Sequence, residues 1–160
     1  MSYQLAQLNI GTIRGPIDGE IMTGFVARLD EINALADGRP GFVWRLQTEE
    51  GNATALHPFE DERILVNMSV WESIDALHQF VYRSTHTELL QQRRDWFHMM
   101  STPILVMWWI EAGHIPDVEE AKQKLQHLEK HGPTPLAFTF KQRFTVEEML
   151  AYREITDAVR

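Results

Sequence analysis

Three residues of this sequence are the best candidates for catalysis: His86, Asn9 and Asn67. The stretch T-H-T-E at 85–88 has the pattern of a capping box, in which Thr85 and Glu88 bond each other's backbone amides. This pattern places His86 at the first helical position, where the helix dipole disfavours an imidazolium. A neutral imidazole can accept a proton, polarise a carbonyl or ligate a metal. The alternative is a histidine that only hydrogen-bonds at the helix end.

Arg93 follows on the same predicted helix, among apolar residues. It shares a stripe at helical spacing with Leu89, Trp96 and Met100. A guanidinium in such surroundings can bind an anionic group of a ligand or pair with a carboxylate. The alternative is that its stem packs on the core while its head stays in water.

The elements that position these residues follow from hydrophobic periodicity and from capping residues. The predicted order is strand, helix, strand, strand, helix pair, strand, which is typical of a ferredoxin-like α+β fold, an antiparallel sheet with helices on one face. We expect residues 1–140 to form this domain and 141–160 to be a C-terminal helical extension. The predicted strands are 3–14, 42–48, 63–71 and 104–113, and the helices are 21–36, 74–81, 86–100, 117–131 and one from Thr145 onward.

Alternation along the first and third strands gives the sheet two different faces. One face is apolar, and we expect the helices to cover it: Ala6, Leu8, Ile10, Val66, Met68 and Val70. The other, here called the mixed face, combines apolar and polar side chains: Gln7, Asn9, Leu65, Asn67, Ser69 and Trp71. The second and fourth strands add to it either Trp44 with Leu46 or Arg45 with Gln47, and either Trp108 or Trp109.

The mixed face carries too many apolar side chains to be fully exposed to solvent, and too many polar ones to be buried in an ordinary hydrophobic core. We therefore predict that two copies pack sheet against sheet and close a barrel around a small molecule. The alternative is that Asn9 and Asn67 only hydrogen-bond each other or the backbone at a dimer interface. The predicted substrate-binding residues are Trp44, Arg45, Trp71, Arg93 and Trp109.

Several motifs carry a resemblance to a known family: LAQLNIG, GFVWRLQ, GNATAL, NMSVWES, FVYRSTH, RRDWF and AGHIP. Over residues 3–140 the chain resembles the domain of unknown function 3291 family. More broadly, the chain resembles the dimeric α/β-barrel superfamily, which includes antibiotic-biosynthesis and haem-degrading monooxygenases. The resemblance implies a dimeric α/β barrel, a homodimer and a pocket, and it implies no particular reaction.

Comparison with the haem-degrading relatives implies a possible haem ligand. Those proteins use an Asn on the first strand, a Trp on the helix after the third strand and a haem-ligating His a few turns later. Asn9 matches the first position, and His86 follows as the ligand would. Phe80 or Tyr82 stands where the Trp belongs, and the spacing to His86 is shorter by a few residues.

Composition excludes several classes of function. The net charge of −8 disfavours nucleic acid, and the absence of cysteine excludes disulfides and thiolate metal sites. His127 and His131 have a metal-compatible spacing, but no third ligand is evident, so no metal is predicted. The apolar run 103–110 is too short to span a membrane, and the N-terminus lacks a signal-peptide pattern, so we expect a cytoplasmic protein.

Three functions remain open. The first is an enzyme of cofactor-independent monooxygenase, isomerase or cyclase type, with Asn9, Asn67 and His86 acting on a flat apolar or aromatic substrate. The second is a haem-binding or haem-degrading protein with His86 as axial ligand. The third is a dimerising protein without catalysis. No cofactor is predicted for the first, and haem is the alternative.

Overall fold

A computed structural model describes residues 2–47, 54, 58–82 and 92–158. His86 lies outside the described residues, as do Thr85 and Glu88. The predicted capping box, and with it the roles of His86 as base or haem ligand, therefore stay predictions.

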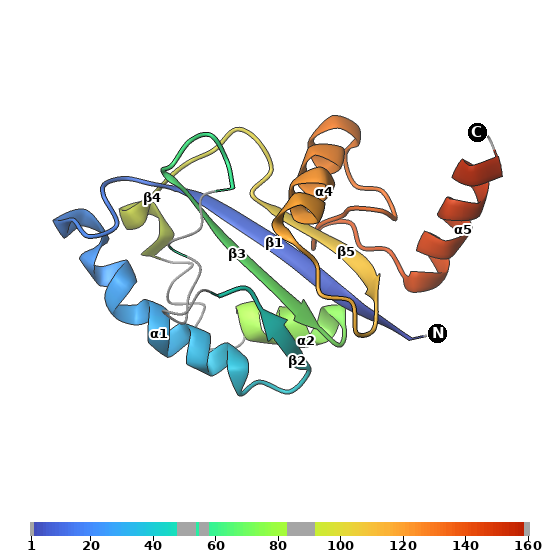
Figure 1. Cartoon of the computed structure of the whole chain (residues 1–160), viewed down its shortest axis with the longest axis horizontal. Helices are drawn as coiled ribbons and strands as arrows, with labels where there is room; N and C mark the ends of the chain where they lie inside the picture. The colour runs from blue at the N-terminus through green and yellow to red at the C-terminus, as the bar shows by residue number, and fades with distance from the viewer. Residues whose placement is uncertain (1, 48–53, 55–57, 83–91, 159–160) are drawn as a thin grey trace.

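An antiparallel sheet forms the centre of the chain (Figure 1). Its central strand is β1 (Tyr3–Ile13), which pairs with β3 (Ile64–Trp71) on one side and β5 (Leu105–Glu111) on the other. The short strand β2 (Phe42–Arg45) pairs with β3 at one edge. The two-residue strand β4 (Phe97–His98) pairs with the end of β1 that β5 does not reach. The chain is thus α+β with an antiparallel sheet, as predicted.

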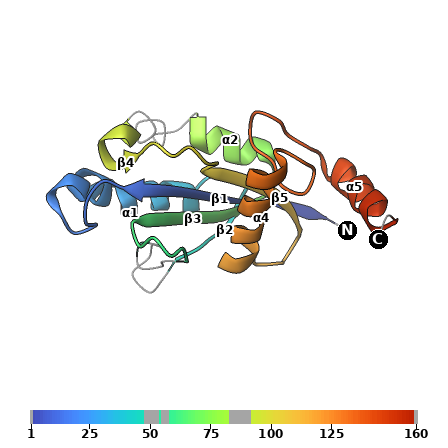
Figure 2. The same ribbon diagram turned by 90° about the horizontal axis from the view of Figure 1, so that it is seen from above.

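The helices lie on both faces of the sheet and beyond its end. Helix α1 (Thr23–Asp37), which follows the 3-10 turn η1 (Glu20–Met22), and helix α2 (Ile74–Tyr82) pack on the mixed face. Helix α4 (Val118–His131) packs on the opposite, apolar face. Helix α5 (Val146–Ala158) stands away from the sheet, at the end of the molecule where both termini lie (Figures 1 and 2). Within the described ranges, no helix is both long and apolar enough to cross a membrane.

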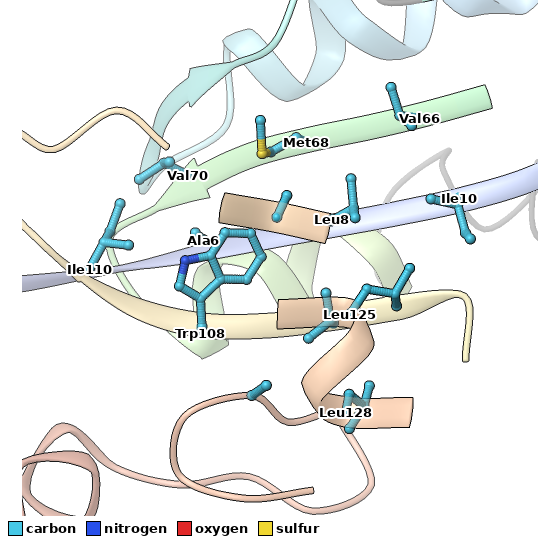
Figure 3. Packing of buried hydrophobic residues seen from close by; sticks show 13 residues of the cluster. Ala6, Leu8, Ile10, Val66, Met68, Val70, Trp108, Ile110, Leu125 and Leu128 are labelled. Atoms are coloured by element: carbon cyan, nitrogen blue, oxygen red, sulfur yellow. The ribbon is translucent and has the colours of Figure 1, made fainter. Parts of the chain in front are cut away.

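The position of the helices corrects one prediction: they do not leave the mixed face bare. Leu5, Trp71 and Met107 of the sheet form one buried cluster with residues of α1 and α2. The apolar face forms a second cluster with α4, and Figure 3 shows Leu125 and Leu128 beside it. Both faces carry enough apolar area to bury a helix, so hydrophobicity alone did not identify the covered one.

Capping residues start the helices as the sequence predicts. The Ser73 hydroxyl accepts from the Ala76 amide at 3.1 Å, and Asp117 Oδ1 accepts from the Glu120 amide at 2.8 Å. Gly132 ends α4 with a φ of 72°, a conformation that favours glycine.

The helix predicted up to Met100 is wrong at its end. Residues 92–96 are helical, but Phe97 and His98 are extended and pair with Ile13 and Thr12 of β1. The apolar spacing of Trp96, Phe97 and Met100 fits a helix equally well. Strand pairing with β1, a long-range contact, decides between the two.

Candidate ligand-binding pocket

A cavity of about 670 Å³ lies between the mixed face and helices α1 and α2. Its size falls within the range of small-molecule sites. Apolar side chains form most of its walls. Eight of the lining residues carry aromatic rings, and the edge-to-face contact of Phe42 with Trp71, at 5.5 Å between centroids, is one example of how these rings pack. The aromatic lining residues are Phe25, Phe42, Trp71, Phe80, Tyr82, Trp96, Phe97 and Phe140.

The register of β1 and β3 gathers the polar side chains of the sheet in one place. Asn9 is opposite Asn67, and Gln7 is opposite Ser69. Gln7 Nε2 donates to Asn67 Oδ1 and to Ser69 Oγ, both at 2.8 Å. Trp71 Nε1 also donates to Ser69 Oγ at 2.8 Å. Four residues on two strands thus form one hydrogen-bond network on the pocket floor.

The network leaves donors available to a ligand. Ser69 Oγ accepts two hydrogen bonds, so its lone pairs are in use and its proton remains to be donated. Asn67 accepts through Oδ1, which leaves its NH₂ group to donate. Gln7 and Ser69 are buried whereas Asn67 is exposed, so solvent reaches the pocket beside Asn67.

Two further polar side chains of the lining are buried without a hydrogen-bond partner in the described part of the chain. Asn33 of α1 is 8% exposed, and Trp96 is 7% exposed. An unpaired buried polar group costs about 1–3 kcal/mol, so both groups favour a polar partner in the cavity. Asn9, half-buried on β1, likewise has no side-chain partner among the described residues.

Arg93 lies against the end of β1 that borders the cavity. Its Nη2 donates to the Ile10 carbonyl at 3.1 Å, and its guanidinium lies 4.9 Å from the centre of the Phe97 ring. Burial lowers the pKa of Arg93 below its ordinary value. Gly11 permits this approach, because a Cβ there would lie 2.6 Å from Phe97 Cδ1 and 3.3 Å from Arg93 Nη2.

The structure brings five of the predicted site residues to this cavity: Asn9, Arg45, Asn67, Trp71 and Arg93. Strand alternation left open whether Trp44 or Arg45 joins the mixed face, and the pairing of Arg45 with Ser69 places Arg45 there. Arg45 Nε is also bound to Asp37 Oδ1 at 2.7 Å, so part of its charge is already used by the protein.

Two predicted binding residues are not brought to the cavity. Trp44 packs against the apolar cluster on the opposite face, because neighbouring strand residues point to opposite sides. Trp109 is on the mixed face, opposite Leu5. It does not line the cavity: its Nε1 donates to the Phe144 carbonyl at 2.9 Å.

Sequence reasoning did not single out Asn33 or Trp96 as site residues. Asn33 carries a usable signal, since it follows Leu29 by four residues and precedes Ala36 by three, so an amide interrupts an apolar helical stripe. Trp96 lies in the same helical stripe as Arg93, and nothing in its spacing indicates that its indole N–H lacks a partner among the described residues.

The described lining contains donors and cations but no carboxylate and no imidazole. It can therefore bind and polarise an acceptor group, while the base predicted for catalysis is His86, outside the described residues. Nor do the described residues include a group of three or more metal-binding side chains. The rings of His127 and His131 lie 4.6 Å apart on α4, and His127 Nε2 contacts Thr134 Oγ1 at 2.9 Å.

Comparisons with known proteins give a family and a structural likeness. The family described as "Domain of unknown function (DUF3291)" matches residues 4–154. No curated protein matches the chain. A crystal structure of NE2512, a protein of unknown function from Nitrosomonas europaea, is similar with 12% identity and a TM-score of 0.44, over 72% of this chain and 96% of that one.

Proposed function

Because the chain belongs to the DUF3291 family, whose description assigns no activity, we propose a function from the pocket itself. We propose that the protein binds a flat, mainly apolar small molecule between the mixed face and helices α1 and α2. The observation that carries this proposal is the cavity of about 670 Å³, whose walls are mainly apolar and whose buried Asn33 and Trp96 have no hydrogen-bond partner among the described residues. Apolar walls with a few polar groups are what a small-molecule site requires.

Catalysis without a cofactor is a further part of the proposal. Donors on the pocket floor, such as Ser69 and Asn67, can stabilise negative charge that develops on a carbonyl oxygen. Monooxygenation, isomerisation and cyclisation of a flat substrate can each begin with loss of a proton that produces such an anion. In monooxygenation the oxidant is dissolved dioxygen: one oxygen atom enters the substrate, and electrons of the substrate reduce the other to water. His86 is proposed as the base, and His86→Ala should then retain ligand binding while losing turnover.

Binding is tested with a neutral, flat, apolar fluorophore, N-phenyl-1-naphthylamine, whose emission rises in apolar surroundings. We expect saturable binding with one site per chain. The variant Leu29→Trp adds an indole to α1 at a half-buried position of the lining. It should weaken binding about tenfold or more, since the added ring occupies the space of the probe.

Ala27→Trp is the matched control, because Ala27 lies on the same helix but is exposed and does not line the cavity. It should bind the probe as the wild type does. Lack of saturable binding by the wild type, or equal binding by Leu29→Trp, would contradict the proposal.

We also propose the ferredoxin-like arrangement and a homodimer for this chain. A barrel of two sheets packed face to face would require a bare face, and helices of this chain cover both faces of its sheet. The strand order β2-β3-β1-β5, antiparallel throughout, and the position of α1 and α2 on one face support the ferredoxin-like arrangement. The dimer rests on the resemblance seen in the sequence. Sedimentation equilibrium should give twice the chain mass of 18.6 kDa, and a monomer mass at all concentrations would contradict it.

A further inference from the structure

The charge of the pocket is opposite to that of the whole chain. The protein has a net charge of −8, yet no Asp or Glu is among the described lining residues. Arg45, Arg93 and Lys141 all line the cavity, and because Asp37 lies 2.7 Å from Arg45, the positive charge of the lining rests mainly on Arg93 and Lys141. A concave site with cations and low-dielectric walls concentrates anions, so this distribution favours a negatively charged ligand.

Arg93 differs from the paired arginines of the same structure. Arg45 and Arg63 each hold an aspartate, Asp37 at 2.7 Å and Asp61 at 2.8 Å. Arg93, which is half-buried, has no carboxylate partner within the described ranges. Among the described residues its side chain makes one hydrogen bond, to the Ile10 carbonyl, whereas a guanidinium has five N–H donors. A cation that is partly removed from water and has no carboxylate beside it favours an anion as its partner.

The surroundings of Arg93 indicate the shape of that anion. Trp96, three residues later, lies on the same side of the helical segment, and its indole N–H has no hydrogen-bond partner in the part of the chain that the structure describes. The guanidinium lies over the ring of Phe97, in a cation–π contact that covers one of its sides. A planar guanidinium matches a planar carboxylate through two parallel hydrogen bonds.

From these observations we infer that the ligand is an aromatic carboxylic acid whose carboxylate binds Arg93 and whose ring lies between the aromatic walls. The inference rests on the proposed function, because it names the chemical class of the molecule that the pocket binds. It makes Arg93 the residue that determines specificity for acids over neutral analogues.

The test compares two ligands that share one ring system, 2-naphthoate and 2-naphthamide, as competitors of N-phenyl-1-naphthylamine near neutral pH. The wild type should bind the naphthoate about tenfold to hundredfold more tightly, as a charged hydrogen bond in a buried site allows. Arg93→Met should bring the two dissociation constants close together, and Arg93→Lys should keep part of the preference. Arg94→Met, which removes a charge from an exposed neighbour, should keep all of it.

The outcomes separate the inference from the proposed function. If the neutral fluorophore binds but the wild type does not prefer the naphthoate, the inference is wrong and the proposed function stands. An unchanged preference in a folded Arg93→Met would also overturn the inference. If the fluorophore does not bind at all, the proposed function fails. The comparison of the two ligands on the wild type does not depend on how Arg93→Met folds.

Discussion

Ser69 is the residue on which the polar network of the pocket floor depends. Its hydroxyl accepts from both Gln7 and Trp71, and all three side chains are buried. Ser69→Ala leaves the Trp71 indole N–H without its acceptor, so we expect the free energy of unfolding to fall by about 1–3 kcal/mol. Urea denaturation measures this change in the free energy of unfolding. Ser101→Ala, at an exposed position, should stay within about 0.5 kcal/mol of the wild type.

Equal stability of Ser69→Ala and the wild type would show that the network contributes nothing to the free energy of unfolding.

Part of this network could be predicted from the sequence, and part could not. Alternation correctly predicts that Gln7, Asn67, Ser69 and Trp71 share a face, because the side-chain period of a strand is fixed. It does not predict which groups bond to one another, since that depends on register and side-chain rotamers.

The lowered pKa of His127 leads us to predict that the free energy of unfolding depends on pH. Burial, followed by the charges of His131 and Lys124, lowers the pKa of His127 below its ordinary value of 6.5. The unfolded chain then takes up a proton at a higher pH than the folded chain does. Stability should therefore fall as the pH decreases through 6.5, and this part of the loss should be absent in His127→Gln.

Urea denaturation at about pH 8 and about pH 5.5, on either side of the ordinary histidine pKa, measures the difference. His98→Gln, an exposed position on β4, serves as the control for a histidine outside this cluster. A wild type and His127→Gln that lose equal stability between the two pH values would refute the prediction.

The N-terminal cap of helix α4 can be tested by substitution. Asp117 caps it by accepting from the Glu120 amide, and α4 holds the apolar face of the sheet through Leu125 and Leu128. Asp117→Ala should lower the free energy of unfolding by about 0.5–2 kcal/mol, because an N-terminal amide loses its acceptor. Asp117→Asn should change it little, since Asn caps helices as well. If the two variants are equally unstable, the cap is not the cause.

Elements with strong local signals could be predicted, and those fixed by long-range contacts could not. Helix α1 follows from apolar spacing, whereas α2 and α4 follow from spacing and N-terminal caps. Helix α5 begins after Thr145, whose hydroxyl forms a capping box with Glu148. The strand β4 could not be predicted, because only its pairing with β1 makes Phe97 and His98 extended. The face that α1 covers depends on the same kind of long-range packing.

At the scale of the whole molecule, one chain covers both faces of its sheet and still leaves a cavity on one of them. The sequence predicts that the mixed face holds the site, and the cavity lies on that face. The sequence does not predict that helices of the same chain cover this face. Its polar residues favour a second copy of the chain as the partner that packs on it. Asn33 lies on α1, and Trp96 lies in the helical segment 92–96. Both line the cavity only because these segments pack on the mixed face, which the sequence does not predict.

The indole N–H signals of the five tryptophans test the central claim, that the ligand binds on the mixed face. Trp71 and Trp96 line the cavity, whereas Trp44 and Trp108 pack on the opposite face. In a ¹H–¹⁵N NMR titration with 2-naphthoate, we predict saturable shifts of the Trp96 and Trp71 signals, with Trp44 and Trp108 unmoved. Shifts confined to Trp44 and Trp108, or no saturable shift of Trp96, would contradict the account.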